Sequence, residues 1–264
     1  MKTAIQTNDL SHAFGGRPVI DRVSLTIAAG DFFVIIGPNG SGKTTLMKLM
    51  CGILNTGPGR IAIFGKDIRS YSHRSLARTI AYVPQTQEAS FPFTVQEAVL
   101  LGRTPHQNLL GIPRAADLEA AHRAMATTGV EHLADRKLDQ LSGGEQQRAS
   151  IARALCQEPD IILLDEPTAS LDLSHQLRLM DLMETLKQEK AVTVVMVSHD
   201  VNLAAMYADR LLLLSDGKIA ELGPPSAVLT PRSLEAAYGC RLMVDEGPFG
   251  GLPRVTLVPG KFRP

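Results

Sequence analysis

The sequence predicts an α/β fold built around a mostly parallel β-sheet. Four short apolar runs are separated by helical patterns, and they span residues 32–36, 161–164, 192–197 and 211–214. Runs of this length that are apolar on both faces are typical of strands in a sheet covered on both sides. Helical patterns follow the first three runs, at residues 43–51, 172–188 and 200–208. This alternation of strand and helix indicates a doubly wound arrangement.

Two regions depart from that alternation. Residues 1–30 look like edge strands, with apolar and polar side chains alternating over residues 23–27, which predicts an antiparallel edge sheet. Residues 94–157 contain no convincing strand but three helical patterns, at residues 94–102, 115–128 and 143–156. We interpret them as a helical subdomain inserted into the sheet. Residues 211–222 predict a hairpin that turns at Asp216-Gly217.

Composition limits the class of protein. The 264 residues are 44% apolar, which suffices for a single domain with a sizeable core. The 27 Lys and Arg balance the 27 Asp and Glu, so a nucleic-acid partner is not expected. No run reaches the roughly 18 apolar residues of a membrane span, and the N-terminus has no secretory pattern. We therefore expect a cytosolic chain whose Cys51, Cys156 and Cys240 are reduced and mostly buried.

Residues 37–45 read GPNGSGKTT and match the phosphate-binding pattern G-x-x-x-x-G-K-[ST]. An apolar strand precedes the loop and a helix follows it, which disfavours the alternative of a glycine-rich turn with an exposed lysine. Glycines let backbone N–H groups converge on a phosphate. Lys43 is expected to reach the outer phosphates and Thr44 to bind Mg²⁺. The other expected binding positions in the loop are Gly37, Pro38, Asn39, Gly40, Ser41, Gly42 and Thr45.

Asp165 and Glu166 follow the apolar run 161–164, where ligands of open α/β sheets bind. Two adjacent carboxylates are costly there unless a cation is near. We expect Asp165 to hold Mg²⁺ through water and Glu166 to orient or deprotonate an attacking water. The alternative is an acidic pair that merely begins a helix.

A second glycine-rich helix start lies at Ser142-Gly143-Gly144, within LSGGEQQR at residues 141–148. Ser142 and Glu145 have the spacing of a capping box, so a capped helix is one interpretation. Two glycines in a first turn weaken a helix by about 1 kcal/mol each. A cap does not need them, whereas close approach to a phosphate does. Both interpretations remain open on spacing alone.

Three further residues are candidate site residues because of where they lie in the sequence. His199 follows the run 192–197, Gln85 follows Tyr82-Val83-Pro84, and Phe14 lies in the N-terminal segment. A histidine at a strand end is more often structural than catalytic. The carbonyl of Gln85 has the chemistry to reach Mg²⁺, and the ring of Phe14 has the chemistry to stack on a base or to join the core.

In this order, the motifs resemble those of the ATP-binding cassette (ABC) family, over about residues 3–240. The most specific is LSGGEQQR at 141–148, which resembles the ABC signature. GPNGSGKTT looks like Walker A and IILLDEP at 161–167 like Walker B. Gln85 matches the Q-loop, residues 169–172 the D-loop, and His199 the H-switch, while Phe14 falls where the family stacks an aromatic ring on adenine.

The resemblance implies an ATPase that works as a head-to-tail dimer with ATP and Mg²⁺. Each ATP lies between Walker A of one subunit and the signature of the other. In that scheme Ser142, Gly143 and Gly144 contact the partner's nucleotide, and Asp172 is also a nucleotide-binding residue. Glu166 and His199 are the catalytic residues. Thr44, Gln85 and Asp165 are the metal-binding residues.

A finer resemblance is to the cassettes of importers of ferric siderophores, haem or vitamin B12. It rests on FPFTVQE at 91–97, LGRTPH at 101–106, LDLSHQ at 171–176 and LTPRSLEAAYG at 229–239. It implies an integral membrane permease dimer, an extracytoplasmic substrate-binding protein and a peripheral location on the cytoplasmic face of the inner membrane. Residues 91–101 are the candidate docking segment for the permease, and a plain amphipathic core helix is the alternative.

The expected division is one ABC ATPase domain, 1–264. It comprises a nucleotide-binding core of residues 1–85 and 158–240, a helical subdomain of residues 86–157 and a tail of residues 241–264. The main competing interpretation is a soluble ABC ATPase that is not coupled to transport. A P-loop phosphotransferase would leave the signature unexplained. A non-catalytic cassette conflicts with the intact Lys43, Asp165, Glu166 and His199.

Overall fold

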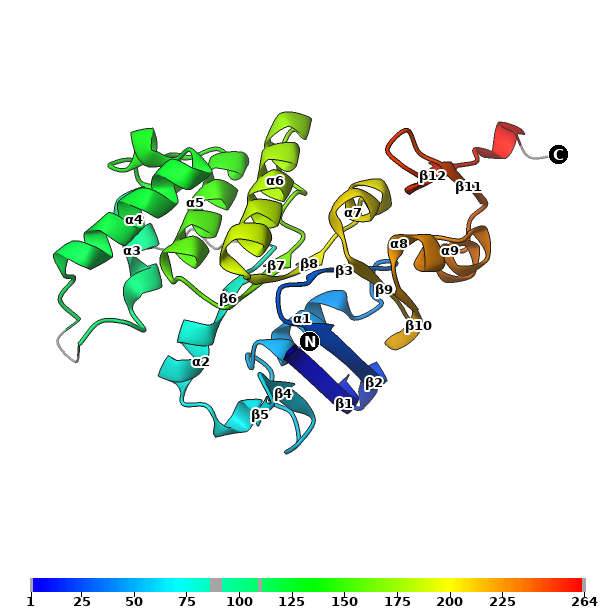
Figure 1. The fold of residues 1–264 in the computed structure, drawn as a ribbon, viewed down its shortest axis with the longest axis horizontal. Helices are drawn as coiled ribbons and strands as arrows, with labels where there is room; N and C mark the ends of the chain where they lie inside the picture. Colours follow the sequence, from blue (N-terminus) through cyan, green and yellow to red (C-terminus); the bar gives the residue numbers. More distant parts are fainter. Residues whose placement is uncertain (1, 86–91, 109–110, 263–264) are drawn as a thin grey trace.

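A six-stranded sheet organises the chain. The computed structural model describes residues 2–85, 92–108 and 111–262. The strand order is β10-β9-β3-β8-β7-β6, and every neighbouring pair is parallel except β9 and β10 (Figure 1). The strands are β3 (Phe32–Ile36), β6 (Ile80–Val83), β7 (Ile161–Asp165), β8 (Thr193–Val197), β9 (Arg210–Ser215) and β10 (Lys218–Gly223). This confirms the α/β class, the four predicted strands and the hairpin at Asp216-Gly217.

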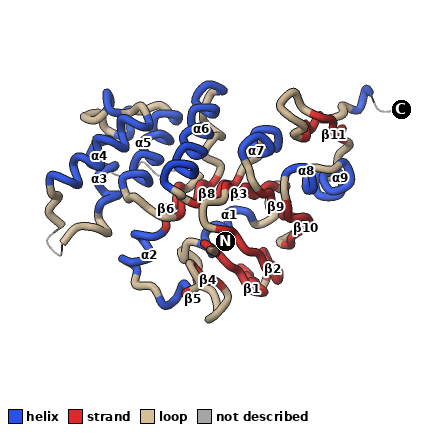
Figure 2. The backbone as a smooth tube through the Cα atoms, viewed as in Figure 1, coloured by secondary structure: helices blue, strands red, loops and turns tan. Residues whose placement is uncertain are grey.

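The two faces of this sheet have separate apolar cores. Phe32, Val34 and Ile36 of β3 face one core, whereas Phe33 and Ile35 face the other. Because neighbouring strands alternate in the same way, each continuous apolar run is buried on both sides. The first core is covered by helices, and Figure 2 shows their layer above the strands. These helices are α6 (Leu173–Lys190), α7 (Val201–Tyr207), α8 (Pro225–Val228) and α9 (Pro231–Tyr238).

The second core lies between the parallel sheet and a four-stranded antiparallel sheet. That sheet has the order β2-β1-β4-β5, with helix α1 (Lys43–Met50) packed in the same core. Its strands are β1 (Thr3–Phe14), β2 (Arg17–Ala28), β4 (Ile61–Ile63) and β5 (Lys66–Asp67), followed by α2 (His73–Thr79). The antiparallel N-terminal sheet is thus confirmed, and it is a layer of its own. Its two short strands, β4 and β5, were not assigned from the sequence.

Three helices pack around a third apolar cluster at one end of the molecule (Figure 1). They are α3 (Val95–Leu100), α4 (Ala115–Thr128) and α5 (Gly143–Cys156). The predicted helices 115–128 and 143–156 have these same bounds. The pattern at 94–102 is an α-helix only over Val95–Leu100, and a 3-10 turn then covers Leu101–Arg103. Val95 and Val99 are fully buried in the cluster, so much of α3 belongs to the core.

The C-terminal segment forms a hairpin that the sequence analysis did not predict. Strands β11 (Leu242–Glu246) and β12 (Pro253–Leu257) pair in antiparallel fashion, and a 3-10 turn follows at Gly260–Phe262. The side chain of Asn202 in α7 donates to Val255 O at 3.1 Å and accepts from Val255 N at 2.7 Å. This amide pair joins the hairpin to the helix that follows His199.

The LGRTPH segment joins helix α2 to α4 and to the end of α5. Arg103 is only 8% exposed; its Nε donates to Asp117 Oδ1 at 3.0 Å and its Nη1 to Glu158 Oε2 at 2.8 Å. The carbonyl of Pro105 accepts from Nε of both Arg74 and Arg78 in α2, at 2.8 Å each. The segment therefore has a structural role at the joint of α2, α4 and the end of α5.

No helix in the described ranges is long and apolar enough to cross a membrane. The three cysteines are free thiols: Cys156 is buried, and Cys51 and Cys240 are half-buried. Burial raises the pKa of the Cys51 and Cys156 thiols to about 11.

Replacing Arg103 by leucine should lower the free energy of unfolding by about 3–5 kcal/mol, because Asp117 would remain buried without its cation. Urea denaturation measures this loss. Arg123→Ala is the matched control, since Arg123 is 63% exposed and pairs with the same Glu158 at 3.4 Å. Exposed pairs contribute about 0–1 kcal/mol.

The loss should also depend on pH. The backbone N–H of Arg114, and then Arg103, hold the pKa of Asp117 below its usual value. Stability from a lowered carboxyl pKa is present above the unfolded pKa and is lost as the pH falls through the folded one. The difference between wild type and Arg103→Leu should therefore shrink in acid. Equal effects of the Arg103 and Arg123 variants would contradict the structural role.

Candidate active site

The register of the parallel strands brings four loops to one edge of the sheet. Val83 of β6 lies opposite Leu164 of β7, and Val197 of β8 lies opposite both Asp165 and Ile35. The loops after β3, β6, β7 and β8 therefore leave from the carboxyl edge, where ligands of such sheets bind. An open cleft of about 460 Å³ lies there, lined by Val19, Asn39, Gly40, Gly42, Lys43, Thr44, Thr45, Gln85, Glu166 and His199.

The loop between β3 and α1 is packed too closely for side chains at two glycines. Gly37 has φ 147° and Gly42 has φ 102°, a region that disfavours L side chains. A Cβ on Gly37 would lie 2.1 Å from Leu214 O, and one on Gly42 would lie 2.8 Å from Val19 O. Glycine at both positions lets the backbone form a compact loop that enters α1, whose N-terminus favours an anion.

Lys43 is the buried cation of this loop. It is 5% exposed, and its Nζ donates to Gly37 O and Pro38 O at 2.9 Å each. Burial lowers the pKa of Lys43, while the nearby Glu166 and Asp165 oppose that shift. The ammonium group is thus held by backbone carbonyls at the floor of the cleft, within reach of a phosphate bound in the loop.

The carboxyl group of Asp165 is fully buried behind the loop. Its Oδ1 accepts from Thr44 Oγ1 and its Oδ2 from Tyr82 Oη, both at 3.1 Å. Burial raises the pKa of Asp165, and the two hydroxyl donors oppose the rise. Tyr82 was missed as a site residue from the sequence, although it lies three positions before Gln85 at the end of β6.

This donor set fits Mg²⁺. A buried carboxylate is stabilised by a nearby cation, and carboxylate and hydroxyl oxygens are hard ligands that Mg²⁺ accepts. Over the ranges that the structure describes, no three His, Cys, Asp or Glu side chains are grouped to hold a metal. A site completed by nucleotide phosphates and water suits Mg²⁺, which keeps waters and uses one or two carboxylates.

Glu166 lies where two other loops meet. Its Oε2 accepts a hydrogen bond from Gln85 Nε2, and its Oε1 lies 2.5 Å from His199 Nε2. Its φ of 50° is unusual for a non-glycine residue and marks a backbone constrained by its surroundings. The structure therefore brings the candidates Gln85, Glu166 and His199 into direct contact beside Lys43.

The residues of the signature-like segment do not line this cleft. Ser142 and Glu145 form the expected capping box, with Ser142 N donating to Glu145 Oε2 at 2.8 Å. A Cβ on Gly144 would meet Ser170 O at 3.4 Å, and one on Gly143 would have no atom nearer than 3.9 Å. Packing within this chain therefore requires neither glycine, so the cap alone does not explain them.

Asp172 and Phe14 also lie outside the cleft lining. Asp172 begins α6, and the backbone N–H and ring of His175 lower its pKa to about 2. Phe14 ends β1; it is 51% exposed and packs edge-to-face on His12, with ring centroids 4.8 Å apart. Val19 of β2, which does line the cleft, was not singled out in the sequence. The nucleotide contacts expected of Asp172 and Phe14 remain predictions.

Comparison with known proteins identifies the family. Residues 20–169 match the family model described as ABC transporter. The ferric enterobactin transport ATP-binding protein FepC of Escherichia coli is 41% identical over 252 residues, covering 96% of this chain and 93% of FepC. The hemin import ATP-binding protein HmuV of Gloeobacter violaceus is 42% identical over 247 residues, with coverages of 91% and 89%.

Among solved structures, a chain described as part of a metal-chelate type ABC transporter in an inward-facing conformation has a TM-score of 0.85 and 29% identity. The match covers 100% of both chains. Together with the cleft lined by Lys43 and Glu166, and with Asp165 buried behind it, these matches confirm the resemblance seen in the sequence. The chain belongs to the ABC transporter family, as an ATP-binding subunit with ATPase activity.

Proposed function

We propose that this protein is the ATP-hydrolysing subunit of an importer that powers uptake of a metal chelate, a ferric siderophore or haem. The observation that carries the ATPase chemistry is the carboxylate of Glu166, held between Gln85 and His199 beside the buried Lys43. The relatives named for ferric enterobactin transport and hemin import support the chelate class. They favour import over the alternative of a soluble ABC ATPase.

Different residues at the cleft have different roles in the proposed binding and hydrolysis of ATP. Backbone N–H groups of the loop and the N-terminus of α1 bind the phosphates, and Lys43 donates to the outer ones. Thr44, Asp165 and Gln85 would hold Mg²⁺, which would supply positive charge to neutralise the phosphates. Glu166 orients the attacking water and accepts its proton, because an ionised carboxylate is an acceptor only. His199 holds that carboxylate and faces the γ-phosphate.

A second copy of the chain completes the site in this proposal. A Cβ on Gly143 would have no atom of this chain nearer than 3.9 Å, and one on Gly144 would make an ordinary contact at 3.4 Å, so packing within the chain does not account for either glycine. A helix N-terminus without side chains suits close approach by a phosphate. We therefore place Ser142, both glycines and Asp172 against the nucleotide of the partner in a head-to-tail dimer.

A membrane permease dimer is the second proposed partner, and it implies a peripheral position on the cytoplasmic face of the inner membrane and an extracytoplasmic substrate-binding protein. The docking candidate is the segment 91–101, of which Phe91 lies outside the described residues. Phe93 is 36% exposed and Leu101 46% exposed, while Val95 and Val99 between them are buried. The division into a core of residues 1–85 and 158–240, a helical subdomain of 86–157 and a tail of 241–264 belongs to the same proposal.

Lys43→Ala should weaken ATP binding about tenfold or more, because it removes the buried cation that donates to the phosphates. Titration with a fluorescent ATP analogue measures the dissociation constant. Lys66→Ala removes an exposed cation elsewhere and should leave affinity unchanged. Unchanged affinity in the Lys43 variant would contradict the assignment.

Glu166→Gln should lower the turnover of ATP about 10²–10⁴-fold while ATP binding is retained, because the amide cannot accept the proton of water. The variant should then accumulate as an ATP-bound dimer, which light scattering after gel filtration detects. Glu189→Gln, an exposed change on α6, is the control. Full turnover in Glu166→Gln would show that another group is the general base.

Ser142→Arg should abolish turnover while each subunit still binds ATP, because the long side chain fills the space opposite the partner's nucleotide. Steady-state hydrolysis and nucleotide titration on the same sample separate the two effects. Ser72→Arg makes the same change at the exposed cap of α2, outside the lining of the cleft, and should keep wild-type turnover. Wild-type turnover in Ser142→Arg would reject a site shared between subunits.

A further inference from the structure

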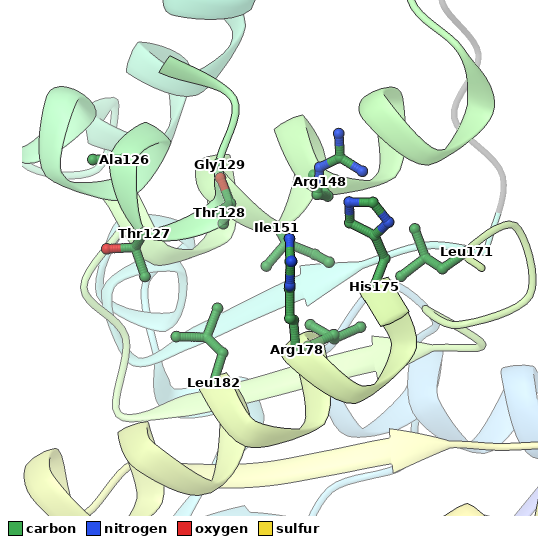
Figure 3. A pocket seen from close by; sticks show the side chains of 11 residues that line it. Ala126, Thr127, Thr128, Gly129, Arg148, Ile151, Leu171, His175, Arg178 and Leu182 are labelled. Atoms are coloured by element: carbon green, nitrogen blue, oxygen red, sulfur yellow. The ribbon is translucent and has the colours of Figure 1, made fainter. Parts of the chain in front are cut away.

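A second cavity lies away from the nucleotide cleft, where α4, α5 and α6 meet (Figure 3). It has a volume of about 220 Å³ and shares no lining residue with the cleft. It is lined by Ala126, Thr127, Thr128, Gly129, Arg148, Ile151, Leu171, His175, Arg178, Leu179 and Leu182. Its walls come from the helical insert on one side and from α6 of the core on the other.

The body of the cavity is apolar. Ile151 of α5 and Leu179 of α6 are buried, Leu171 precedes α6 and is 8% exposed, and Leu182 closes the side towards α4. The aliphatic surfaces contributed by opposite helices can receive an apolar group between them.

The hydroxyls of Thr127 and Thr128 donate to backbone carbonyls of α4, and the other polar side chains of the lining are cationic or titratable, with no Asp or Glu among them. Arg148 comes from α5, whereas His175 and Arg178 come from α6. Figure 3 shows Arg178 extending from α6 towards Ile151 of α5, and the ring of His175 lying next to Arg148. The cavity therefore combines an apolar interior with a surplus of positive charge.

The acidic groups nearby are bound to other partners. Asp172 Oδ1 accepts from Ser174 Oγ and from the backbone and ring of His175, all within 2.9 Å. Asp181 Oδ1 accepts from Tyr207 Oη at 2.6 Å. Glu145, which interacts electrostatically with Arg148, accepts hydrogen bonds from Ser142 N and Ser142 Oγ. Within the described part of the chain, the guanidinium groups of the half-buried Arg148 and the exposed Arg178 form neither a hydrogen bond nor a salt bridge.

We propose that this cavity is a binding site for a small carboxylate with an apolar body, such as an aromatic or branched-chain acid. Guanidinium groups bind carboxylates through paired, charge-assisted hydrogen bonds, so the acid group lies at Arg148 and Arg178. The apolar body packs against Ile151, Leu179 and Leu182. The volume is below the roughly 300–1,000 Å³ of sites for drug-sized ligands, which sets the small size of the acid.

The cavity lies between two helices that belong to different parts of the molecule. Helix α5 begins at the signature-like Ser142, and α6 begins after Asp172. A carboxylate held by one arginine from each helix links the helical insert to the core. Binding here is a property separate from ATP hydrolysis, and it can be tested without nucleotide.

Benzoate is the probe, measured by ligand-observed NMR and by calorimetric titration of the full chain. Wild type should bind it, and Arg178→Ala should weaken binding about tenfold through loss of a charge-assisted contact. Arg178→Lys should lose less, since the charge remains. Lys190→Ala removes an exposed cation from the same helix outside the cavity and should bind benzoate as wild type does.

Two further small molecules test separately whether the apolar body and the carboxylate of the ligand contribute to binding. Acetate lacks the apolar body and benzamide lacks the charge, so both should bind more weakly than benzoate. Leu182→Phe should reduce benzoate binding by filling the cavity, and ATP titration confirms that each variant is folded. No saturable binding of benzoate, equal binding by Arg178→Ala, or equal affinity for benzamide would overturn the proposal.

Discussion

The alignment of the parallel strands is the constraint on which the site depends. Backbone pairing sets Val83 against Leu164, and Asp165 and Ile35 against Val197. The residues that follow these strands must then meet at one edge, although they are separated by up to 160 positions or so along the chain. A slip of one residue in this pairing would turn every side chain of that strand to the opposite face. Such a slip would disrupt the packing of both apolar cores. The cores therefore stabilise the strand pairing that sets the geometry of the cleft.

Buried charge at that edge explains why the site suits a phosphate and a metal ion. Asp165 is fully buried and Lys43 nearly so, and burial raises the pKa of the acid and lowers that of the lysine. Neither charge is well solvated, so both favour a bound partner of opposite charge. Hydroxyl groups of Thr44 and Tyr82 orient the acid, while Gln85 and His199 orient Glu166. The cleft is thus organised by hydrogen bonds from helix α1, from strand β6 and from the segments that follow β6 and β8.

Much of the fold and of the cleft could be predicted from the sequence, because the strands, loops and helix caps concerned depend on residues close together in the chain. An apolar run followed by GPNGSGKT specifies a strand, a compact loop and a helix within a few residues, and helix caps such as Ser142 with Glu145 depend on spacing alone. Features that depend on distant contacts were missed. The strand Lys66–Asp67 and the hairpin of Leu242–Glu246 with Pro253–Leu257 are short or exposed, so their patterns are weak. The contacts of Arg103 and Tyr82 join residues 14 to 83 positions apart, and no local pattern reveals such pairs.

In the proposed function, the ATP-bound dimer acts on a membrane permease. The most direct measurement is co-purification of tagged Glu166→Gln protein from solubilised native membranes in Mg-ATP, with the bound chains identified by mass spectrometry. If the chain powers transport, a polytopic membrane protein should be recovered. It should be lost when Phe93 and Leu101 of the proposed docking segment are replaced by aspartate. Recovery of soluble partners alone would contradict a role in transport while leaving the ATPase chemistry in place.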